Sequence, residues 1–158
     1  MIVDKTPTRL MSDSTRLTEV LHLIRETFAY MEGRIDPPSS MHRLTVEELQ
    51  RQARDGEIWG IGDRPNAVVF LTPKPDCLYL SKLAVAQNKR GQGLARRLVE
   101  VAEHRARAKG FRALELQTRV ELVENHAAFA RLGFAITGET THAGYDRTTS
   151  LTMRKRLD

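Results

Sequence analysis

The sequence has little of what cross-linked, metal-binding or membrane-spanning proteins need. Cys77 is the one cysteine among 158 residues, so no disulfide can form within the chain and no cysteine-based zinc site is available. The five histidines are scattered without the spacing of metal ligands. No run of eighteen apolar residues occurs, and the N-terminus lacks the apolar stretch of a signal peptide. We therefore expect a cytoplasmic protein that holds no metal and has no membrane partner.

Aromatic residues are also few, at 6%, while 41% of the residues are hydrophobic and 28% are charged. This composition is typical of a soluble globular protein and excludes collagen-like, coiled-coil and low-complexity chains. No repeat or linker divides the chain, so we expect a single domain over residues 1–158. The net charge is +5 and the pI is about 9.7. Composition alone leaves open whether a nucleic acid or a small anion is the partner of this basic surface.

The first third of the chain predicts two amphipathic helices. Over residues 13–30 the apolar side chains recur at helical spacing, and Asp13 or Ser14 can cap the start. Two consecutive prolines then predict a loop. A second helix is predicted over residues 45–56, because it begins with a threonine and a glutamate in capping-box spacing and ends at a glycine.

The rest of the chain alternates strands and helices. Three short apolar runs separated by turns predict an antiparallel meander, at residues 58–61, 67–71 and 78–85. Further elements are predicted as a helix at 93–109, a strand at 113–118, a helix at 125–132 and strands at 134–140 and 148–156. The step from residue 78 to 118 is a βαβ crossover, which requires a parallel pair of strands. We therefore predict an α/β fold with a mixed, mostly antiparallel sheet and helices on both faces.

The segment most informative about chemistry is the glycine-containing run at residues 89–95, between a predicted strand and a predicted helix. Glycines allow a sharp turn and close approach of a ligand, and the first amides of the next helix favour a phosphate group. Lys89, Arg90 and Arg96 add positive charge. The run lacks the ending of a Walker loop and the third glycine of a dinucleotide fingerprint. By itself it is also consistent with a plain glycine-rich turn.

Two separated motifs resemble the GNAT superfamily of N-acetyltransferases. In that superfamily a strand ending in Ala-Val leads into Arg/Gln-x-x-Gly-x-Gly/Ala, which here reads RGQGLA at residues 90–95. A second stretch of the superfamily has an asparagine, an aromatic residue and Gly-Phe, and here reads NHAAFARLGF at residues 125–134. The resemblance is specific from Leu78 to Phe134 and weak over the first 56 residues.

The resemblance implies acetyl-CoA as co-substrate. Its pyrophosphate would lie on the amides of the loop, at Arg90, Gly91, Gln92, Gly93, Leu94 and Ala95. Its pantetheine arm would lie between two splayed strands and pair with the backbone of Leu83, Ala84 and Val85. Asn125 and Phe129 would complete the cofactor site. A primary amine of an unidentified small molecule or peptide would then attack the thioester directly in a ternary complex.

This sequence departs from the superfamily at two positions. Many members have a tyrosine where Phe129 stands, and phenylalanine cannot protonate the departing thiolate. Either another group does so or CoA leaves as the thiolate, which is tolerable for a thiol with a pKa near ~8.5. The run Gln117-Thr118-Arg119 stands where members that acetylate ribosomal protein N-termini often have Glu-Val-Arg. Both departures count against the mechanism of that subfamily.

The remaining candidates lie in loops and on strand faces. Tyr145, between the last two predicted strands, is a candidate catalytic acid, and packing within its turn is the alternative. Tyr30, Glu32 and Gln117 are candidate substrate-binding residues, and for Glu32 a solvated loop charge is the alternative. Tyr79 and Ser81 lie on one side of their strand, and further candidates are His142, Asp146 and Asp36.

The sequence also permits two other functions. The basic charge permits a toxin-like enzyme that acetylates charged tRNA, and the phenylalanine at position 129 permits a non-catalytic module that binds acyl-CoA. We favour the acetyltransferase of a small-molecule or peptide amine, because CoA is itself polyanionic and accounts for much of the basic excess. A nucleic acid is therefore only a minor alternative as a partner. Relatives often dimerise, so a homodimer is an option by analogy.

Overall fold

The computed structural model describes residues 5–158, apart from the side chains of residues 40 and 42. Residues 1–4, part of the segment in which we expect no signal peptide, lie outside the described residues. The elements run in the order β1 (Pro7–Arg9), α1 (Leu17–Phe28), η1 (Ala29–Met31), η2 (Ser40–Arg43), α2 (Val46–Asp55), β2 (Glu57–Ile61), β3 (Ala67–Pro73), β4 (Leu78–Val85), η3 (Gln87–Lys89), α3 (Leu94–Ala108), β5 (Ala113–Arg119), α4 (Val123–Arg131), β6 (Ala135–Thr140) and β7 (Ser150–Arg156).

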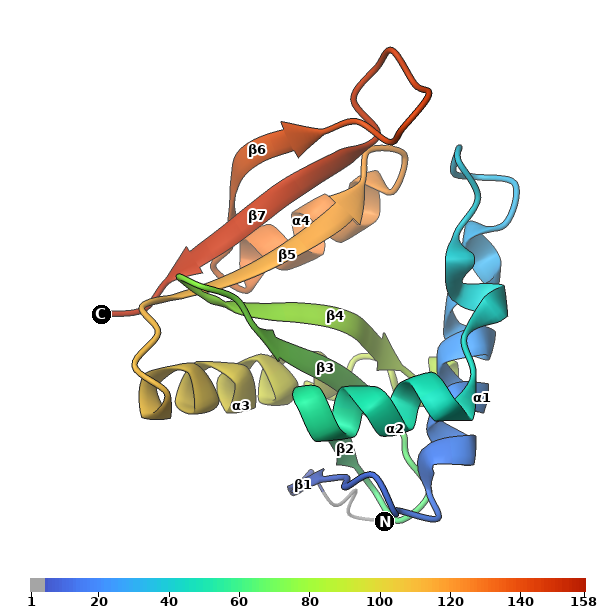
Figure 1. Ribbon diagram of the computed structural model, residues 1–158, viewed down its shortest axis with the longest axis vertical. Coiled ribbons are helices and arrows are strands. Elements are labelled where there is room, and N and C mark those ends of the chain that lie inside the picture. The colour runs from blue at the N-terminus through green and yellow to red at the C-terminus, as the bar shows by residue number, and fades with distance from the viewer. Residues whose placement is uncertain (1–4) are drawn as a thin grey trace.

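One mixed sheet carries the fold, with its strands in the order β1-β2-β3-β4-β5-β7-β6 (Figure 1). The β4–β5 pair is parallel, and every other pair is antiparallel. The predicted α/β fold and its βαβ crossover through α3 are therefore confirmed. Within the described part of the chain, no helix is both long and apolar enough to cross a membrane.

The two faces of the sheet hold separate apolar cores. On one face, Leu94, Leu98 and other side chains of α3 pack with Leu114 of β5, and Phe129 of α4 packs against the same cluster. On the other face, α1 and α2 pack against β2, β3 and β4, with Ile24 and Leu49 fully buried. Helices therefore cover both faces, as the sequence predicts (Figure 1).

Helix α1 and strand β1 differ from the prediction, whereas the cap of α2 agrees with it. Helix α1 begins at Leu17 rather than at residue 13, because Ser14 does not cap it: the Ser14 hydroxyl accepts from the Arg16 amide at 3.1 Å within the preceding turn. The predicted cap of α2 is present, since the Thr45 hydroxyl accepts from the Glu48 amide at 3.3 Å. Strand β1 has no counterpart in the prediction, because three residues are too few to show a period.

A buried carboxylate fixes α3 to the sheet. Glu57 of β2 is 2% exposed and accepts from Arg105 at 2.8 and 2.9 Å and from Trp59 at 2.7 Å. Lys109 adds a second cation at 3.3 Å. Burial alone would raise the pKa of Glu57, but the hydrogen bonds from Arg105 and Trp59 outweigh it and hold the pKa at about 2.

The sheet opens in its middle. Strands β4 and β5 pair only at Leu78–Leu114 and Tyr79–Glu115, although they continue to Val85 and Arg119. Figure 1 shows them close together at one end and diverging toward α1. The predicted V between these strands is therefore present, and the backbone edges facing into it lack a strand partner.

A bulge in β4 lies beside this opening. The register with β3 shifts by one residue between Phe70–Ser81 and Val68–Ala84, so β4 carries an extra residue there. Lys82, within the bulge, has a φ of +54°. A left-handed conformation costs a non-glycine residue about 1–2 kcal/mol, so the surrounding structure must hold Lys82 in place.

Candidate functional site

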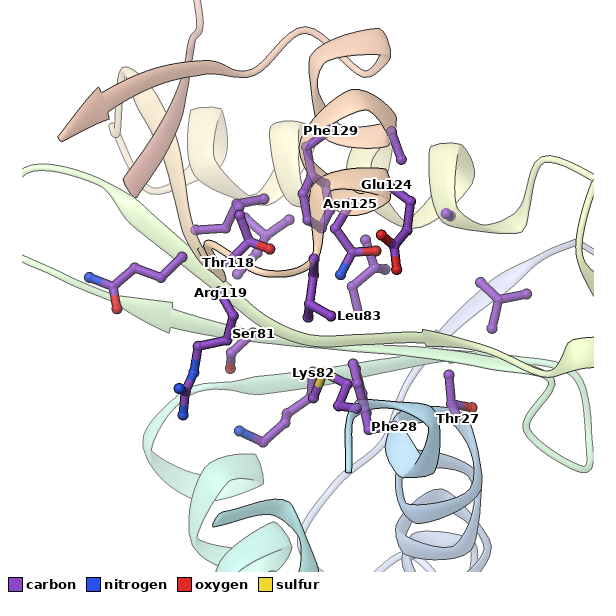
Figure 2. A pocket seen from close by; sticks show the side chains of 18 of the residues that line it. Thr27, Phe28, Ser81, Lys82, Leu83, Thr118, Arg119, Glu124, Asn125 and Phe129 are labelled. Atoms are coloured by element: carbon purple, nitrogen blue, oxygen red, sulfur yellow. The ribbon is translucent and has the colours of Figure 1, made fainter. Parts of the chain in front are cut away.

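A cavity of about 970 Å³ occupies the space between the diverging strands. Its walls come from α1 and η1, from β4 and β5, from the loop before α3, and from α4 (Figure 2). It brings together most of the residues that the sequence singled out, namely Tyr30, Leu83, Val85, Arg90, Gly91, Gly93, Leu94, Ala95, Gln117, Asn125 and Phe129. These residues are far apart in sequence, so their convergence is a finding of the structure.

Six sequence candidates are not among the residues that line this cavity, and Asp36 and Asp146 are two of them. Ala84 is 1% exposed and packs in the core under α1 and α2, because it points to the face opposite its strand neighbours. Glu32 lines an adjoining pocket of about 630 Å³. The side chains of Gln92 and Tyr145 are not among those that line the large cavity. For Ala84 and Gln92, backbone contact with a ligand stays a prediction.

The loop before α3 is built to receive an anion. Gly91 and Gly93 have φ values of +78° and +79°, and a Cβ atom placed on either would meet nothing within 4 Å, so the space beside both is open. Gly93 is the N-cap of α3 and offers no side-chain cap. The first amide that bonds back is Arg97, to the Gly93 carbonyl at 3.0 Å. In the described structure the three preceding amides therefore have no backbone acceptor.

The charge of the cavity is strongly positive. Lys89, Arg90 and Arg96 line it near the start of α3. Among the described carboxylates, Glu124 alone lines it, and Arg34 already pairs with Glu124 at 2.7 Å. A polyanionic ligand would thus enter a site where positive charge is largely uncompensated.

Contacts between η1 and α4 join these two elements at one wall of the cavity. The Asn125 amide donates to the Tyr30 hydroxyl at 3.4 Å, and the Arg34–Glu124 pair lies beside it. The guanidinium of Arg34 also lies over the Tyr30 ring, 5.6 Å from its centre. The predicted cofactor residue Asn125 and the predicted substrate residue Tyr30 therefore meet at one wall.

Tyr145 is held outside the cavity. Its hydroxyl donates to Asp36 Oδ1 at 2.6 Å, and this hydrogen bond raises the pKa of Tyr145. Arg119 Nη1 donates to the Pro37 carbonyl at 2.8 Å, and Arg147 donates to the Asp36 carbonyl at 2.8 Å. These contacts tie the segment between α1 and α2 to the C-terminal half. A catalytic role for Tyr145 stays a prediction.

Lys82 and Thr118 are among the cavity-lining residues that sequence reasoning missed. Lys82 lies in the β4 bulge, and burial lowers the pKa of its ammonium, while the charge of Glu48 opposes that shift. The signal available in the sequence was a lysine inside an apolar strand. Thr118 is 6% exposed, and its hydroxyl has no hydrogen-bond partner within the described structure. A threonine on a strand carries no signal of this kind.

The other polar candidates differ in whether they line the cavity. Tyr79 and Ser81 both line the cavity, and burial raises the pKa of Tyr79. His142 also lines the cavity, with its ring hydrogen-bonded to the Thr149 hydroxyl. Cys77 is 1% exposed and lies outside the cavity lining, and burial raises the pKa of its thiol.

The model of the Acetyltransferase (GNAT) family matches residues 18–134, from α1 to the start of β6. This chain belongs to the GNAT acetyltransferase family. The expected resemblance is therefore confirmed, and the family uses acyl-CoA as its acyl donor.

Individual GNAT relatives agree with this assignment. An IAA acetyltransferase of Azospirillum brasilense is 30% identical over 145 residues, which is 87% of this chain and 90% of that protein. An acetyltransferase of Streptococcus agalactiae has a TM-score of 0.74 at 18% identity, with 96% of this chain and 98% of that chain covered. A GNAT acetyltransferase of Elizabethkingia anophelis with acetyl-CoA bound has a TM-score of 0.67 at 16% identity, with 96% and 97% covered. At these identities the two structures show that the GNAT fold is shared.

Proposed function

We propose that this GNAT enzyme transfers the acetyl group of acetyl-CoA to the primary amine of a small molecule or peptide. The observation that carries the proposal is the open, uncapped start of α3, which adjoins a positively charged cavity between β4 and β5, two strands that pair only at one end. A long ligand with a polyanionic end and an extended amide arm fits both features.

The chain has the groups needed to hold such a ligand. The amides of Leu94 to Arg96 would bind the pyrophosphate, helped by Lys89 and Arg90. The free edge of β4 offers backbone donors and acceptors to the amides of the pantetheine arm. The unpartnered Thr118 hydroxyl supplies a further hydrogen bond from β5. The bound acetyl-CoA supplies an activated thioester.

Direct attack by the amine is supported by the described part of the chain, in which no activated nucleophile lines the cavity. Cys77 is buried outside the cavity lining, and its thiol pKa is raised. In the described structure the Ser81 hydroxyl, which lines the cavity, donates no hydrogen bond to a histidine or carboxylate that would activate it. The enzyme therefore acts mainly by holding two substrates in register and by offering a backbone amide of β4 to the developing oxyanion.

The leaving group presents the point at which this chain differs from many relatives. Phe129 lines the cavity and packs edge-on against Phe134, with ring centres 6.1 Å apart. The Phe129 ring maintains the shape of the cavity wall and excludes water, but it has no proton to donate. CoA then departs as a thiolate, which is feasible because its thiol has a pKa near ~8.5.

The test uses two glycines that share a backbone conformation. Gly93 and Gly110 have φ values of +79° and +82°, and a Cβ on either meets nothing within 4 Å. Valine at either position therefore costs the fold a similar strain, but only Gly93→Val fills the ligand space. We expect Gly93→Val to weaken acetyl-CoA binding by about 100-fold or more in calorimetry, corresponding to about 2.7 kcal/mol. Gly110→Val should bind as the wild type does. Unchanged affinity in a folded Gly93→Val protein would refute the site.

Turnover separates an enzyme from a binding module. The phenylalanine at position 129 and the engagement of Tyr145 by Asp36 are the observations that favour a non-catalytic acyl-CoA-binding module as the second candidate. Release of CoA thiol in a screen of amino acids, polyamines, aminoglycosides and peptides establishes the enzyme. Tight acetyl-CoA binding without thiol release across the screen establishes the module.

A further inference from the structure

Lys82 occupies a special place in the cavity. It lies in the β4 bulge with a φ of +54°, between Ser81 and Leu83, and all three residues line the cavity. In Figure 2, Leu83 extends toward Asn125 and Phe129, whereas Lys82 extends to the other side of β4, where Phe28 lies. The bulge thus directs an ammonium group into the half of the cavity that the proposed CoA arm leaves open.

This ammonium group has no anionic partner in direct contact within the described structure. The other cations of the same half are already engaged: Arg34 pairs with Glu124 at 2.7 Å, and Arg119 donates to the Pro37 carbonyl at 2.8 Å. Glu48 attracts Lys82 from a distance, but it is exposed on α2 and hydrogen-bonded to Thr45. A half-buried ammonium without a partner is unfavourable, and a bound anion would relieve it.

The surface next to Lys82 is apolar. Met31, Ile35 and Leu122 form a small buried cluster, against which Phe28 and Met41 pack. All five residues line the large cavity, and all except Leu122 also line the adjoining pocket of about 630 Å³. A ligand that reaches Lys82 therefore has an apolar wall beside it and room beyond it.

We propose that Lys82 binds the carboxylate of the acceptor, and that the acceptor is an amino acid with an apolar side chain. This inference rests on the proposed function. The ammonium of Lys82 would hold the carboxylate, the cluster of Met31, Ile35 and Leu122 would hold the side chain, and the amine would face the thioester. An ammonium group can pair with a single carboxylate as a compact point charge.

The transfer itself balances without any further reactant. The lone pair of the neutral amine forms the N–C bond to the thioester carbonyl carbon, and the C–S bond breaks. The sulfur leaves with the bonding pair, and the proton lost by the amine passes to solvent or to the thiolate. The products are an N-acetyl amino acid and CoA, so the carboxylate is still present after the reaction and the product should bind Lys82 as well.

Product binding tests the subsite without relying on turnover. Calorimetry of the CoA-saturated protein compares N-acetylphenylalanine with N-acetylphenylalaninamide, which differ only in the charged group. We expect the acid to bind about 10-fold or more tightly, as a hydrogen bond to a charged group implies. Lys82→Met should remove this difference in affinity, and Lys82→Arg should keep part of it. Lysine, methionine and arginine should tolerate the backbone strain at position 82 equally. Lys5→Met, an exposed lysine outside the cavity lining, should leave the difference unchanged.

Steady-state kinetics provides a second test of the carboxylate subsite. We expect phenylalanine and leucine to have kcat/KM values at least 10-fold above those of phenylalaninamide and phenethylamine, and Lys82→Met to abolish the preference. Equal values for acid and amide, or a uniform loss with all acceptors in Lys82→Met, would overturn the carboxylate subsite and leave the proposed function standing. Failure of acetyl-CoA to bind would instead overturn the proposed function. Preference for serine over leucine would overturn the apolar part of the proposal.

Discussion

The Tyr145 hydroxyl donates to Asp36 Oδ1 at 2.6 Å, across 109 residues of sequence. The same aspartate donates its amide to Glu121 at 3.0 Å and accepts at its carbonyl from Arg147 at 2.8 Å. Three chain segments thus meet at Asp36, and together they hold the stretch between α1 and α2 against the far half of the sheet. Under the proposed function, this stretch would form the acceptor end of the cavity, and its position would decide which acceptor fits.

Tyr145→Phe distinguishes a positioning role from a catalytic one. Because the hydroxyl is engaged by Asp36 outside the cavity lining, we expect kcat to change less than about threefold, whereas loss of a general acid would lower it by about 100-fold or more. The KM for the acceptor should rise, since the Asp36 segment is less well held. Steady-state kinetics at saturating acetyl-CoA measures kcat and KM. Tyr30→Phe, which removes the hydroxyl of a tyrosine that lines the cavity, is measured for comparison. A kcat loss of 100-fold would restore Tyr145 as the acid.

Thr118→Val separates ligand binding from stability. The Thr118 hydroxyl is buried without a partner in the described structure, so its removal should leave stability unchanged or raise it by about 1 kcal/mol. If that hydroxyl serves the pantetheine arm, acetyl-CoA affinity should fall by about threefold to tenfold.

Thr149→Val is the matched control for that variant. Thr149 is fully buried, and its hydroxyl accepts from the His142 amide at 2.9 Å, so the valine variant should be less stable by about 1–2 kcal/mol. Urea denaturation and calorimetry measure the two quantities for both variants. Destabilisation of Thr118→Val to the same extent as Thr149→Val would show that Thr118 has a structural partner.

The pH dependence of stability should report on Glu57. Its pKa is held at about 2, below the ordinary value of 4.5. A carboxylate with a lowered pKa stabilises the fold fully above its unfolded pKa, and this contribution is lost as the pH falls from about 4.5 toward 2. We expect Glu57→Gln to lose about 2 kcal/mol at pH 7, less than a fully buried pair because Arg105 is partly exposed.

Chemical denaturation between pH 7 and pH 3 tests this expectation. The Glu57→Gln protein should lose stability less steeply on acidification than the wild type. Glu100→Gln, an exposed carboxylate on α3, should behave as the wild type does. Parallel pH curves for the wild type and Glu57→Gln would contradict the assignment.

The salt dependence of acetyl-CoA binding should depend on the cations near the loop. Lys89 and Arg90 line the cavity beside the uncapped start of α3. Replacing each by alanine should weaken binding by about twofold to fivefold at low salt, because exposed charges contribute about 0.5–1 kcal/mol, and it should flatten the dependence on ionic strength. Arg97→Ala is the control, since this exposed arginine lies on the same helix but does not line the cavity. A full salt dependence in the double variant would exclude a role for both cations.

The sequence was sufficient for the features that depend on local signals. The crossover around α3 could be predicted because a strand, a glycine loop and a helix follow one another directly, and each has its own pattern. The cavity residues on that loop followed from the same signals. Strand β1 did not, because Pro7–Arg9 is too short for periodicity and is defined only by pairing with β2.

Features set by distant contacts could not be read from the sequence. The bulge at Lys82 depends on the register between β4 and β3, and nothing within residues 78–85 specifies which residue is extra. The position of Tyr145 depends on Asp36, which no local pattern connects to it. The contact between Tyr30 and Asn125 likewise follows from tertiary packing.

Because β4 and β5 diverge after Tyr79, the stability of the folded state should depend on whether a ligand is bound between them. Only two residue pairs join the two strands. Beyond these pairs, the packed helices hold the two halves of the sheet together, because the strands, as the structure describes them, make no hydrogen bonds to each other there. A ligand bound in the gap between the strands stabilises the folded state by RT ln(1 + [L]/Kd), which is about 2.7 kcal/mol when the ligand concentration is 100 times Kd. That gain is a large fraction of the net stability of an ordinary domain. Under the proposed function, the resistance of this protein to unfolding and proteolysis in the cell would rise and fall with the acetyl-CoA supply.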